Sequence, residues 1–176
     1  YYLFSEFEDQ SLLPLFDTSE LNFSFSQLFR EDRFSGGDRT GDADQASIAI
    51  TSRILDEKGK ESARMSLGQI HYFDDRKVNL SNPIQSWIPR YSPLNPKSAL
   101  AGEFALSFGE SWRLNTDVQW NEETEELDEG SFQLRYHRDN DHLFNIAYRR
   151  RNLVGSPNFI LPAGIDPRIK QTDLSV

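Results

Sequence analysis

The residues of this chain that could support chemistry are three histidines and a large number of acidic side chains. His71, His137 and His142 do not have the spacing of a metal site. The sequence contains neither a serine nucleophile motif nor a phosphate-binding glycine loop. Carboxylate pairs of the glycosidase type could be found among 28 acidic residues, but such a surplus makes any one pair uninformative. We therefore predict no catalytic residues, no cofactor and no metal.

The most distinctive local string is FSGGDRTGDAD at residues 34–44. Its Gly and Asp content predicts a tight loop that tolerates left-handed backbone conformations. Asp38, Asp42 and Asp44 could offer oxygen ligands to calcium, although their spacing matches neither an EF-hand nor a glycine-rich calcium repeat. We favour a structural turn in which Arg39 pairs with a carboxylate.

A second acidic cluster occupies residues 121–130. It predicts a solvated loop, and the alternative is that divalent cations bridge its carboxylates to anionic lipid headgroups. The net charge of -9 argues against a nucleic-acid partner, which requires clustered Lys and Arg.

The elements that would position these residues are strands, because apolar and polar residues alternate through most of the chain. In the clearest run, Trp112, Leu114, Thr116, Val118 and Trp120 alternate with Arg113, Asn115, Asp117 and Gln119. Runs at 131–137 and 142–150 add Gln133, Arg135, His137, Asn145 and Arg149 to the polar set. These runs, like those at 45–54 and 98–108, are about 8 to 11 residues long, which matches the roughly 9 to 11 residues with which a tilted strand crosses a bilayer.

The expected strands are separated by alternately short and long connections. We place strands near residues 1–7, 45–55, 63–73, 98–108, 112–120, 131–138, 142–150 and 171–176. The short turns are expected at 56–61, 109–111 and 139–141, and the long connections at 8–44, 74–97, 121–130 and 151–171. This alternation puts the long loops at one end of the sheet, as in outer-membrane barrels with short periplasmic turns and long extracellular loops.

Two irregular features are also predicted. Met65 and Leu67 share one face of their strand, whereas Ile70 and Tyr72 fall on the other, so we expect a bulge near Gly68 and Gln69. The connection 8–44 is too apolar for free solution, and we expect it to fold over or into the barrel mouth as a lid. Its apolar residues include Leu12, Leu13, Leu15, Phe16, Phe23, Phe25, Leu28, Phe29 and Phe34. The segments 82–96 and 151–171 are expected to be irregular external loops.

Composition agrees with a barrel that has a wet interior. A mean hydropathy of -0.63 with 37% hydrophobic residues leaves little material for a conventional core in a single domain. No run approaches the length of a membrane helix, and the chain contains no cysteine. The chain starts at Tyr1 without a secretory signal, so we expect residues 1–176 to be a fragment, a partial barrel domain.

A family resemblance is carried by three strings: FSQLFREDRFSGGDRTGDADQ (25–45), SLGQIHYF (66–73) and YHRDNDHLFNIAYRRR (136–151). Together they resemble the barrel domain of the LptD (OstA) family of lipopolysaccharide-assembly outer-membrane proteins. The resemblance implies an all-β, antiparallel transmembrane segment, about eight strands from the middle of a larger barrel. It also implies a Gram-negative outer membrane and a role in inserting lipopolysaccharide into the outer leaflet.

The resemblance implies partners as well. These are lipopolysaccharide, outer-membrane lipid, an LptE-like lipoprotein plug in the lumen and a periplasmic transport bridge reached through an N-terminal domain outside this chain. The polar residues named above are then candidates to face the lumen, where cross-strand bonds along the wall are the first expectation and contact with a plug or with substrate the second. Two alternatives remain at this point: a soluble or surface β-sandwich that binds glycans, and a small self-contained barrel pore.

Overall fold

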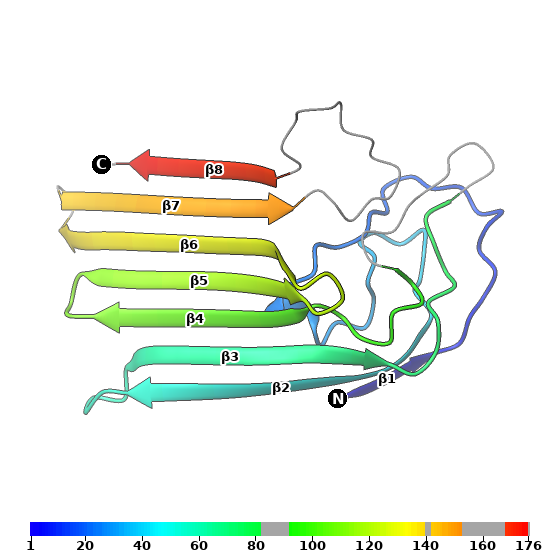
Figure 1. Ribbon diagram of the computed structural model, residues 1–176, viewed down its shortest axis with the longest axis horizontal. Helices are drawn as coiled ribbons and strands as arrows, with labels where there is room; N and C mark the ends of the chain where they lie inside the picture. The colour runs from blue at the N-terminus through cyan, green and yellow to red at the C-terminus, as the bar shows by residue number, and fades with distance from the viewer. Residues whose placement is uncertain (82–91, 140–141, 153–167, 176) are drawn as a thin grey trace. The chain divides into compact units, whose positions relative to one another are not determined.

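The computed structural model describes residues 1–81, 92–139, 142–152 and 168–175, and these form an all-β structure (Figure 1). The strands are β1 (Tyr2–Ser5), β2 (Ala43–Leu55), β3 (Glu61–Tyr72), β4 (Leu100–Phe108), β5 (Trp112–Asn121), β6 (Glu126–Asp139), β7 (His142–Asn152) and β8 (Arg168–Ser175). One short 3-10 helix, Phe25–Gln27, lies between β1 and β2. Within the described ranges, no helix is long and apolar enough to span a membrane. Each strand that the alternation predicts is present.

The strands form one antiparallel sheet in which each is hydrogen-bonded to its neighbours in sequence, from β1 to β8 (Figure 1). A sandwich would divide them between two packed sheets, which is not the arrangement found. Among the described residues, β1 pairs with β2 alone and β8 with β7 alone. The outer strands therefore do not close the sheet on each other, as a self-contained barrel of these strands would require. The fold is consistent with a segment of a larger barrel.

Two of the three predicted short connections lie in the described residues and turn where the sequence predicts. Between β2 and β3, the carboxylate of Asp56 accepts hydrogen bonds from the backbone N–H groups of Lys58 and Lys60, at 2.9 and 2.8 Å. Gly59 has a φ of 79°, a left-handed conformation that glycine adopts without steric cost. Residues 109–111 join β4 to β5. The turn predicted at 139–141 includes Asp139, the last residue of β6, and its residues 140–141 lie outside the described part.

The longer connections lie at the opposite end of the sheet, because successive turns of an antiparallel meander alternate between its two ends. Residues 6–42 join β1 to β2, and residues 73–99 join β3 to β4. The irregular loops predicted at 82–96 and 151–171 fall largely on residues 82–91 and 153–167, which lie outside the described part. Residues 168–171, assigned to the second loop, belong to β8.

The long loop predicted at residues 121–130 is wrong. The connection between β5 and β6 is only residues 122–125, and β6 begins at Glu126. The acidic side chains there have partners in β7: Nδ2 of Asn152 donates to Glu126 at 3.0 Å, and Nε of Arg151 lies 3.2 Å from a Glu129 oxygen. The register shifts opposite Asp128, so the strand takes up one extra residue as a bulge.

The bulge predicted in β3 is also wrong. Burial alternates regularly through Gly68, with Ser66, Gly68 and Ile70 buried and Met65 and Leu67 exposed. The register instead changes on the partner side. Gly68 pairs with Ala101 and His71 with Lys97, so three steps along β3 match four along the partner segment. The extra residue therefore lies between Lys97 and Ala101.

The chain divides into two compact units. The first contains Tyr1–Ile48 and Gln69–Ser98, and its core consists of Phe34, Val78 and Leu80 with Leu15 packed against them. The two long connections thus pack on each other. The second unit contains Ala49–Gly68 and β4 to β8, and its buried apolar side chains among the described residues are Ala99 and Ala101. The sheet in this unit lacks the thick apolar core of a soluble domain.

Candidate functional site

The strand register places the predicted polar residues on one face of the sheet, because residues opposite each other in antiparallel strands point to the same side. One row runs Arg113, Arg135, Asn145 and Ser175, and a second runs Asn115, Gln133, Ala147 and Asp173. A third runs Glu103, Asp117, Ser131, Arg149 and Gln171. Gln119 and His137 occupy further alternate positions on the same face of β5 and β6. All the predicted residues therefore share this face, which we call the polar face.

Part of the polar face is hollowed near the short-turn end of β5 to β8. The hollow has a volume of about 680 Å³. It is lined by Glu110, Ser111, Arg113, Gln133, Arg135, Tyr136, His137, Leu143, Asn145, Ala147, Arg149, Asp173, Leu174 and Ser175. Most of the predicted polar residues of β5 to β7 thus gather in one concave region.

Cross-strand bonds on the polar face satisfy only part of its donors. Oγ of Ser131 donates to Asp117 at 2.7 Å, and Nδ2 of Asn145 donates to Ser175 at 3.2 Å. Within the described residues, the guanidinium groups of Arg113, Arg135 and Arg149 make no side-chain hydrogen bond or ion pair. The expected bonding along the wall is thus present for Asp117 and Asn145, whereas the three arginines keep donors that no described side chain takes up.

The other face of β4 to β8, which we call the apolar face, carries aromatic and aliphatic rows. At the short-turn end, Phe108 and Trp112 stack at 5.7 Å between ring centroids, and Trp112 contacts Tyr136 at 4.8 Å. The next row is Leu106, Leu114, Leu134, Ile146 and Leu174. The row after that contains Phe104, Thr116, Phe132, Tyr148 and Thr172. An aromatic row that borders an aliphatic band is the pattern of a barrel wall facing lipid.

Exposure confirms that this apolar face lacks cover within the described structure. Phe132 is 39% exposed, Trp120 42% and Leu174 65%. Trp112 and Trp120 lie near the two ends of β5, which is where membrane-crossing strands carry their interfacial aromatic residues. Exposed apolar residues on one face of a sheet mark a surface that contacts lipid or another protein.

The string at residues 34–44 is a structural loop held by Arg33 rather than by Arg39. Nη2 of Arg33 lies 2.7 Å from the carboxylate of Asp42 and 2.6 Å from the carbonyl oxygen of Val78. Arg39 is almost fully buried, and it donates to the backbone carbonyls of Leu13 and Asp38, not to a carboxylate. The predicted Arg39 pair is therefore wrong, and the cation that pairs lies six positions earlier.

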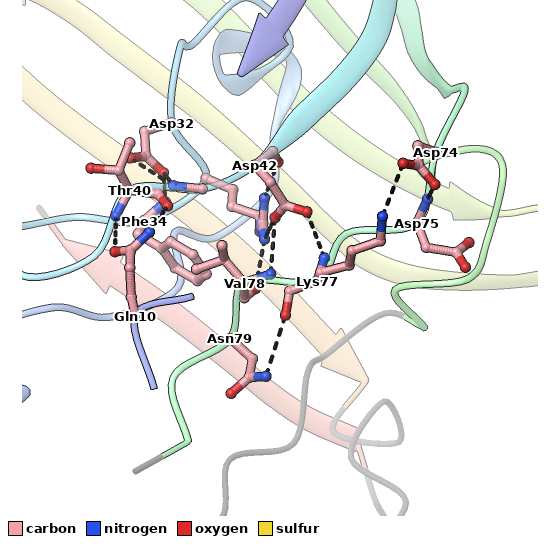
Figure 2. A network of polar contacts seen from close by, with 12 residues as sticks. Gln10, Asp32, Phe34, Thr40, Asp42, Asp74, Asp75, Lys77, Val78 and Asn79 are labelled. Atoms are coloured by element: carbon pink, nitrogen blue, oxygen red, sulfur yellow. Dashed lines mark hydrogen bonds and ion pairs between the residues drawn. The ribbon is translucent and has the colours of Figure 1, made fainter. Parts of the chain in front are cut away.

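Asp42 joins the two long connections of the first unit, as Figure 2 shows. Its carboxylate accepts hydrogen bonds from the backbone N–H groups of Lys77 and Val78 at 2.7 and 3.0 Å. Burial acts to raise the pKa of Asp42, but the hydrogen bonds from Arg33, Lys77 and Val78 outweigh it and hold the pKa below its usual value. The charged carboxylate is thus a structural link.

The suggested calcium ligands have separate protein partners. Asp38 accepts hydrogen bonds from the backbone N–H groups of Phe16 and Asp17, both at 2.9 Å, and Asp44 accepts one from the Tyr2 hydroxyl at 2.8 Å. The bonds from Asp17 and Phe16 lower the pKa of Asp38. No group of three or more His, Cys, Asp or Glu in the described residues is arranged to hold a metal ion.

The sequence missed both the Arg33–Asp42 link and its attachment to Val78. No periodic pattern could have revealed them, since they depend on packing between connections that lie far apart in sequence. The sequence analysis also did not predict that the apolar face carries a basic residue at position 150. Arg150 continues the two-residue spacing of Phe144, Ile146 and Tyr148 in β7.

A single antiparallel sheet with one polar and one uncovered apolar face defines the class of transmembrane β-barrel proteins. The family described as LptD, LPS transport system D, matches the chain over residues 1–176. The chain belongs to this family.

Curated relatives agree with that membership. The chain is 38% identical to the LPS-assembly protein LptD of Pseudomonas aeruginosa (strain UCBPP-PA14), with 99% of the chain and 20% of the relative covered. It is 40% identical to the LPS-assembly protein LptD of Xylella fastidiosa (strain Temecula1), with the same coverage. The protein of that name from Xanthomonas oryzae pv. oryzae (strain MAFF 311018) is 36% identical, with 99% and 21% covered. The chain thus spans about a fifth of the length of these relatives.

Proposed function

We propose that this chain forms part of the wall of a larger β-barrel in the outer membrane of a Gram-negative bacterium, and that the barrel inserts lipopolysaccharide into the outer leaflet. The observation that carries the proposal is the strand register, which sorts the side chains of β4 to β8 into a polar face and an apolar face. Membership of the LptD family supplies the link to lipopolysaccharide.

The outer strands support the assignment of residues 1–176 as a partial barrel domain. In lipid, every backbone N–H and C=O group needs a partner within the protein. Within the described residues, β1 and β8 each pair on one side only. In a bilayer both edges would therefore pair with further strands of the whole protein, since an open edge in hydrocarbon is too costly.

The polar face is proposed to line the barrel lumen. Arg113, Arg135 and Arg149 offer hydrogen-bond donors that no described side chain takes up, and Gln133 and Asn145 add amides beside them. Guanidinium and amide groups suit phosphates and sugar hydroxyls, or the polar surface of a plug protein. The proposed partners are lipopolysaccharide, an LptE-like lipoprotein in the lumen, and a periplasmic bridge that acts through another domain. No catalysis and no cofactor are assigned to this segment.

The proposal is tested by reversing charge on the polar face of the full-length protein. Cells that depend on an Arg113→Glu and Arg135→Glu variant should deliver pulse-labelled lipopolysaccharide to their surface several-fold more slowly, because the variant repels phosphates. Lys58→Glu and Lys60→Glu make the same charge change in a short turn and should leave delivery unchanged. Heat-modifiable gel mobility would show that both variants fold. Normal delivery in the folded Arg113 and Arg135 variant would contradict the proposal.

A further inference from the structure

Two arginines lie directly opposite each other at the hollowed end of the polar face. Arg113 of β5 pairs with Arg135 of β6, and the same row continues to Ser107 of β4 on one side and to Asn145 of β7 on the other. Like charges that are directly opposite in a sheet are destabilising. Among its described positions this row contains no acidic residue, so nothing within the row offsets the repulsion between the two guanidinium groups.

A third arginine lines the same hollow from β7. Arg149 lies two rows from Asn145, and Ala147 occupies the row between them. Because the methyl group of Ala147 fills little of that row, space remains above it. Gln133 lies opposite Ala147, and its amide makes no hydrogen bond to a described residue. The hollow thus combines three cationic groups with an amide that has no protein partner in the described structure.

The acidic residues of the hollow do not neutralise its arginines. Glu110 belongs to the turn between β4 and β5, and the carboxylate of Asp173 in β8 accepts hydrogen bonds from Nε2 of Gln171 at 3.2 and 3.0 Å. Within the described residues, no ion pair joins either acid to any of the three arginines. With His137 neutral, the lining therefore carries three positive charges against two negative ones.

The size and chemistry of the hollow suit a small anionic group better than a protein surface. Its volume of about 680 Å³ lies within the range of about 300–1,000 Å³ that is typical of small-molecule sites. A stable protein–protein contact instead covers about 800 Å² on each partner. Guanidinium groups bind phosphate through paired N–H donors, and side-chain amides bond hydroxyl groups. The lining is therefore suited to a phosphorylated sugar.

We propose that the hollow is a phosphate-recognition site for the sugar portion of lipopolysaccharide. Arg113 and Arg135 hold a phosphate group between them, Arg149 adds further positive charge, and Gln133 bonds neighbouring hydroxyl groups. The hollow lies at the short-turn end of the sheet, which faces the periplasm in outer-membrane barrels, so the substrate meets it on entering the lumen. The site rests on the proposed function and deepens it, because it assigns these arginines to phosphate and not to the carboxylates of a plug protein.

The test compares the affinity of the full-length protein for one oligosaccharide with and without its phosphates. Purified protein in detergent is titrated calorimetrically with deacylated lipopolysaccharide, and with the same oligosaccharide after hydrofluoric acid has removed the phosphates. Arg113→Gln with Arg135→Gln should weaken binding of the phosphorylated form about tenfold, because charge-assisted hydrogen bonds are lost. Affinity for the dephosphorylated form should be the same in the variant and in the unmodified protein.

Two further variants separate geometry from charge. Arg113→Lys with Arg135→Lys keeps both charges but loses the planar paired donors, so it should bind the phosphorylated form with intermediate affinity. Lys58→Gln with Lys60→Gln removes the same charge from the turn between β2 and β3 and should bind it as the unmodified protein does. Equal loss in this control and in the arginine-to-glutamine variant would overturn the site, because affinity would then follow net charge alone.

Other results would also overturn the site. Inorganic phosphate that competes as effectively as the phosphorylated oligosaccharide at equal concentration would assign the arginines to free phosphate. Loss of a copurified plug protein from the glutamine variant, with affinity for the oligosaccharide intact, would assign them to the carboxylates of that protein. If the double variant does not fold by heat-modifiable gel mobility, the single Arg135→Gln variant gives the same comparison.

Failure of the site and failure of the proposed function give different results. Charge reversal at Arg113 and Arg135 slows delivery by repulsion whether or not the hollow binds phosphate. Unchanged affinity in the glutamine variant, together with slow delivery in the glutamate variant, would therefore reject the site alone. Contact of position 133 with lipid in the folded protein would reject the polar lumen, and the site with it.

Discussion

Phe132 and Gln133 are neighbours in β6 and lie on opposite faces of the sheet. Phe132 is opposite Thr116 and Tyr148, whereas Gln133 is opposite Asn115 and Ala147. This relationship extends along β5 to β7 and separates an apolar surface from a polar one. Substitutions at these two positions therefore compare the environment of the apolar face with that of the polar face.

A charge at position 132 should destabilise the membrane-embedded protein. Phe132→Arg puts a cation on the apolar face between the aliphatic row and Arg150, where the cost of burial in lipid is about 2–4 kcal/mol at the midplane. Gln133→Arg puts the same charge on the polar face and should cost less than about 1 kcal/mol. Urea unfolding of the full-length protein in liposomes, followed by gel mobility, measures both. Equal stability of the two variants would show that the apolar face does not meet lipid.

Removing the charge of Asp42 should loosen the two long connections of the first unit. Asp42→Asn weakens the bond to Arg33 and leaves a partly buried cation, at a cost of about 1–3 kcal/mol. Hydrogen exchange of the full-length protein should then accelerate in residues 32–42 and 73–81. Asp75→Asn removes an exposed charge from the same connection and should leave exchange unchanged. Unaltered exchange in Asp42→Asn would show that this link does not hold the connections together.

The same link predicts a pH dependence. Because the pKa of Asp42 is lower in the folded unit than the usual value of about 3.9, its contribution is present above that value and is lost as the pH falls through the folded pKa. Exchange at Lys77 and Val78, corrected for intrinsic rates, should accelerate in acid below about pH 4 in the unmodified protein. Asp42→Asn should show fast exchange at every pH. A transition near neutral pH would assign the effect to another group.

A side chain at position 41 should displace the guanidinium group of Arg33. A Cβ atom there would lie 2.7 Å from Nη1 of Arg33 and 3.0 Å from a carboxylate oxygen of Asp32. Gly41→Ala should therefore displace Arg33 and accelerate exchange at Val78. At Gly37 a Cβ atom would meet no atom within 4 Å, so Gly37→Ala is the control. Similar exchange in both variants would show that a Cβ atom at position 41 does not displace Arg33.

The sheet could be predicted from the sequence because alternation is a local property of each strand. The polar residues from Arg113 to Arg149 were assigned to one face for the same reason, and the register confirms that they share it. The acidic composition of residues 121–130 predicted a loop, but β6 begins at Glu126, and Glu129 pairs with Arg151 of β7 within the sheet. Charge in a sequence does not reveal whether a partner is available across a strand.

Contacts between distant connections could not be predicted in this way. The sequence favoured Arg39 as the paired cation, whereas Arg33 makes the pair because its guanidinium also reaches Val78 in another connection. The pairing of Arg150 with Lys170 could not be predicted either, because it depends on the register between two strands and not on either strand alone. The lid predicted for residues 8–44 stays a prediction.

Accessibility of nitroxide labels at positions 131 to 136 of β6 tests the central claim most directly. Cysteines introduced one at a time into the cysteine-free segment of the full-length protein would be labelled after reconstitution into liposomes. Collision rates with oxygen, which concentrates in hydrocarbon, and with a water-soluble nickel chelate would then be compared. We predict that positions 132, 134 and 136 favour oxygen and that 131, 133 and 135 favour nickel. Uniform access to nickel, or a lack of alternation, would contradict the account of this sheet as a barrel wall between lipid and a polar lumen.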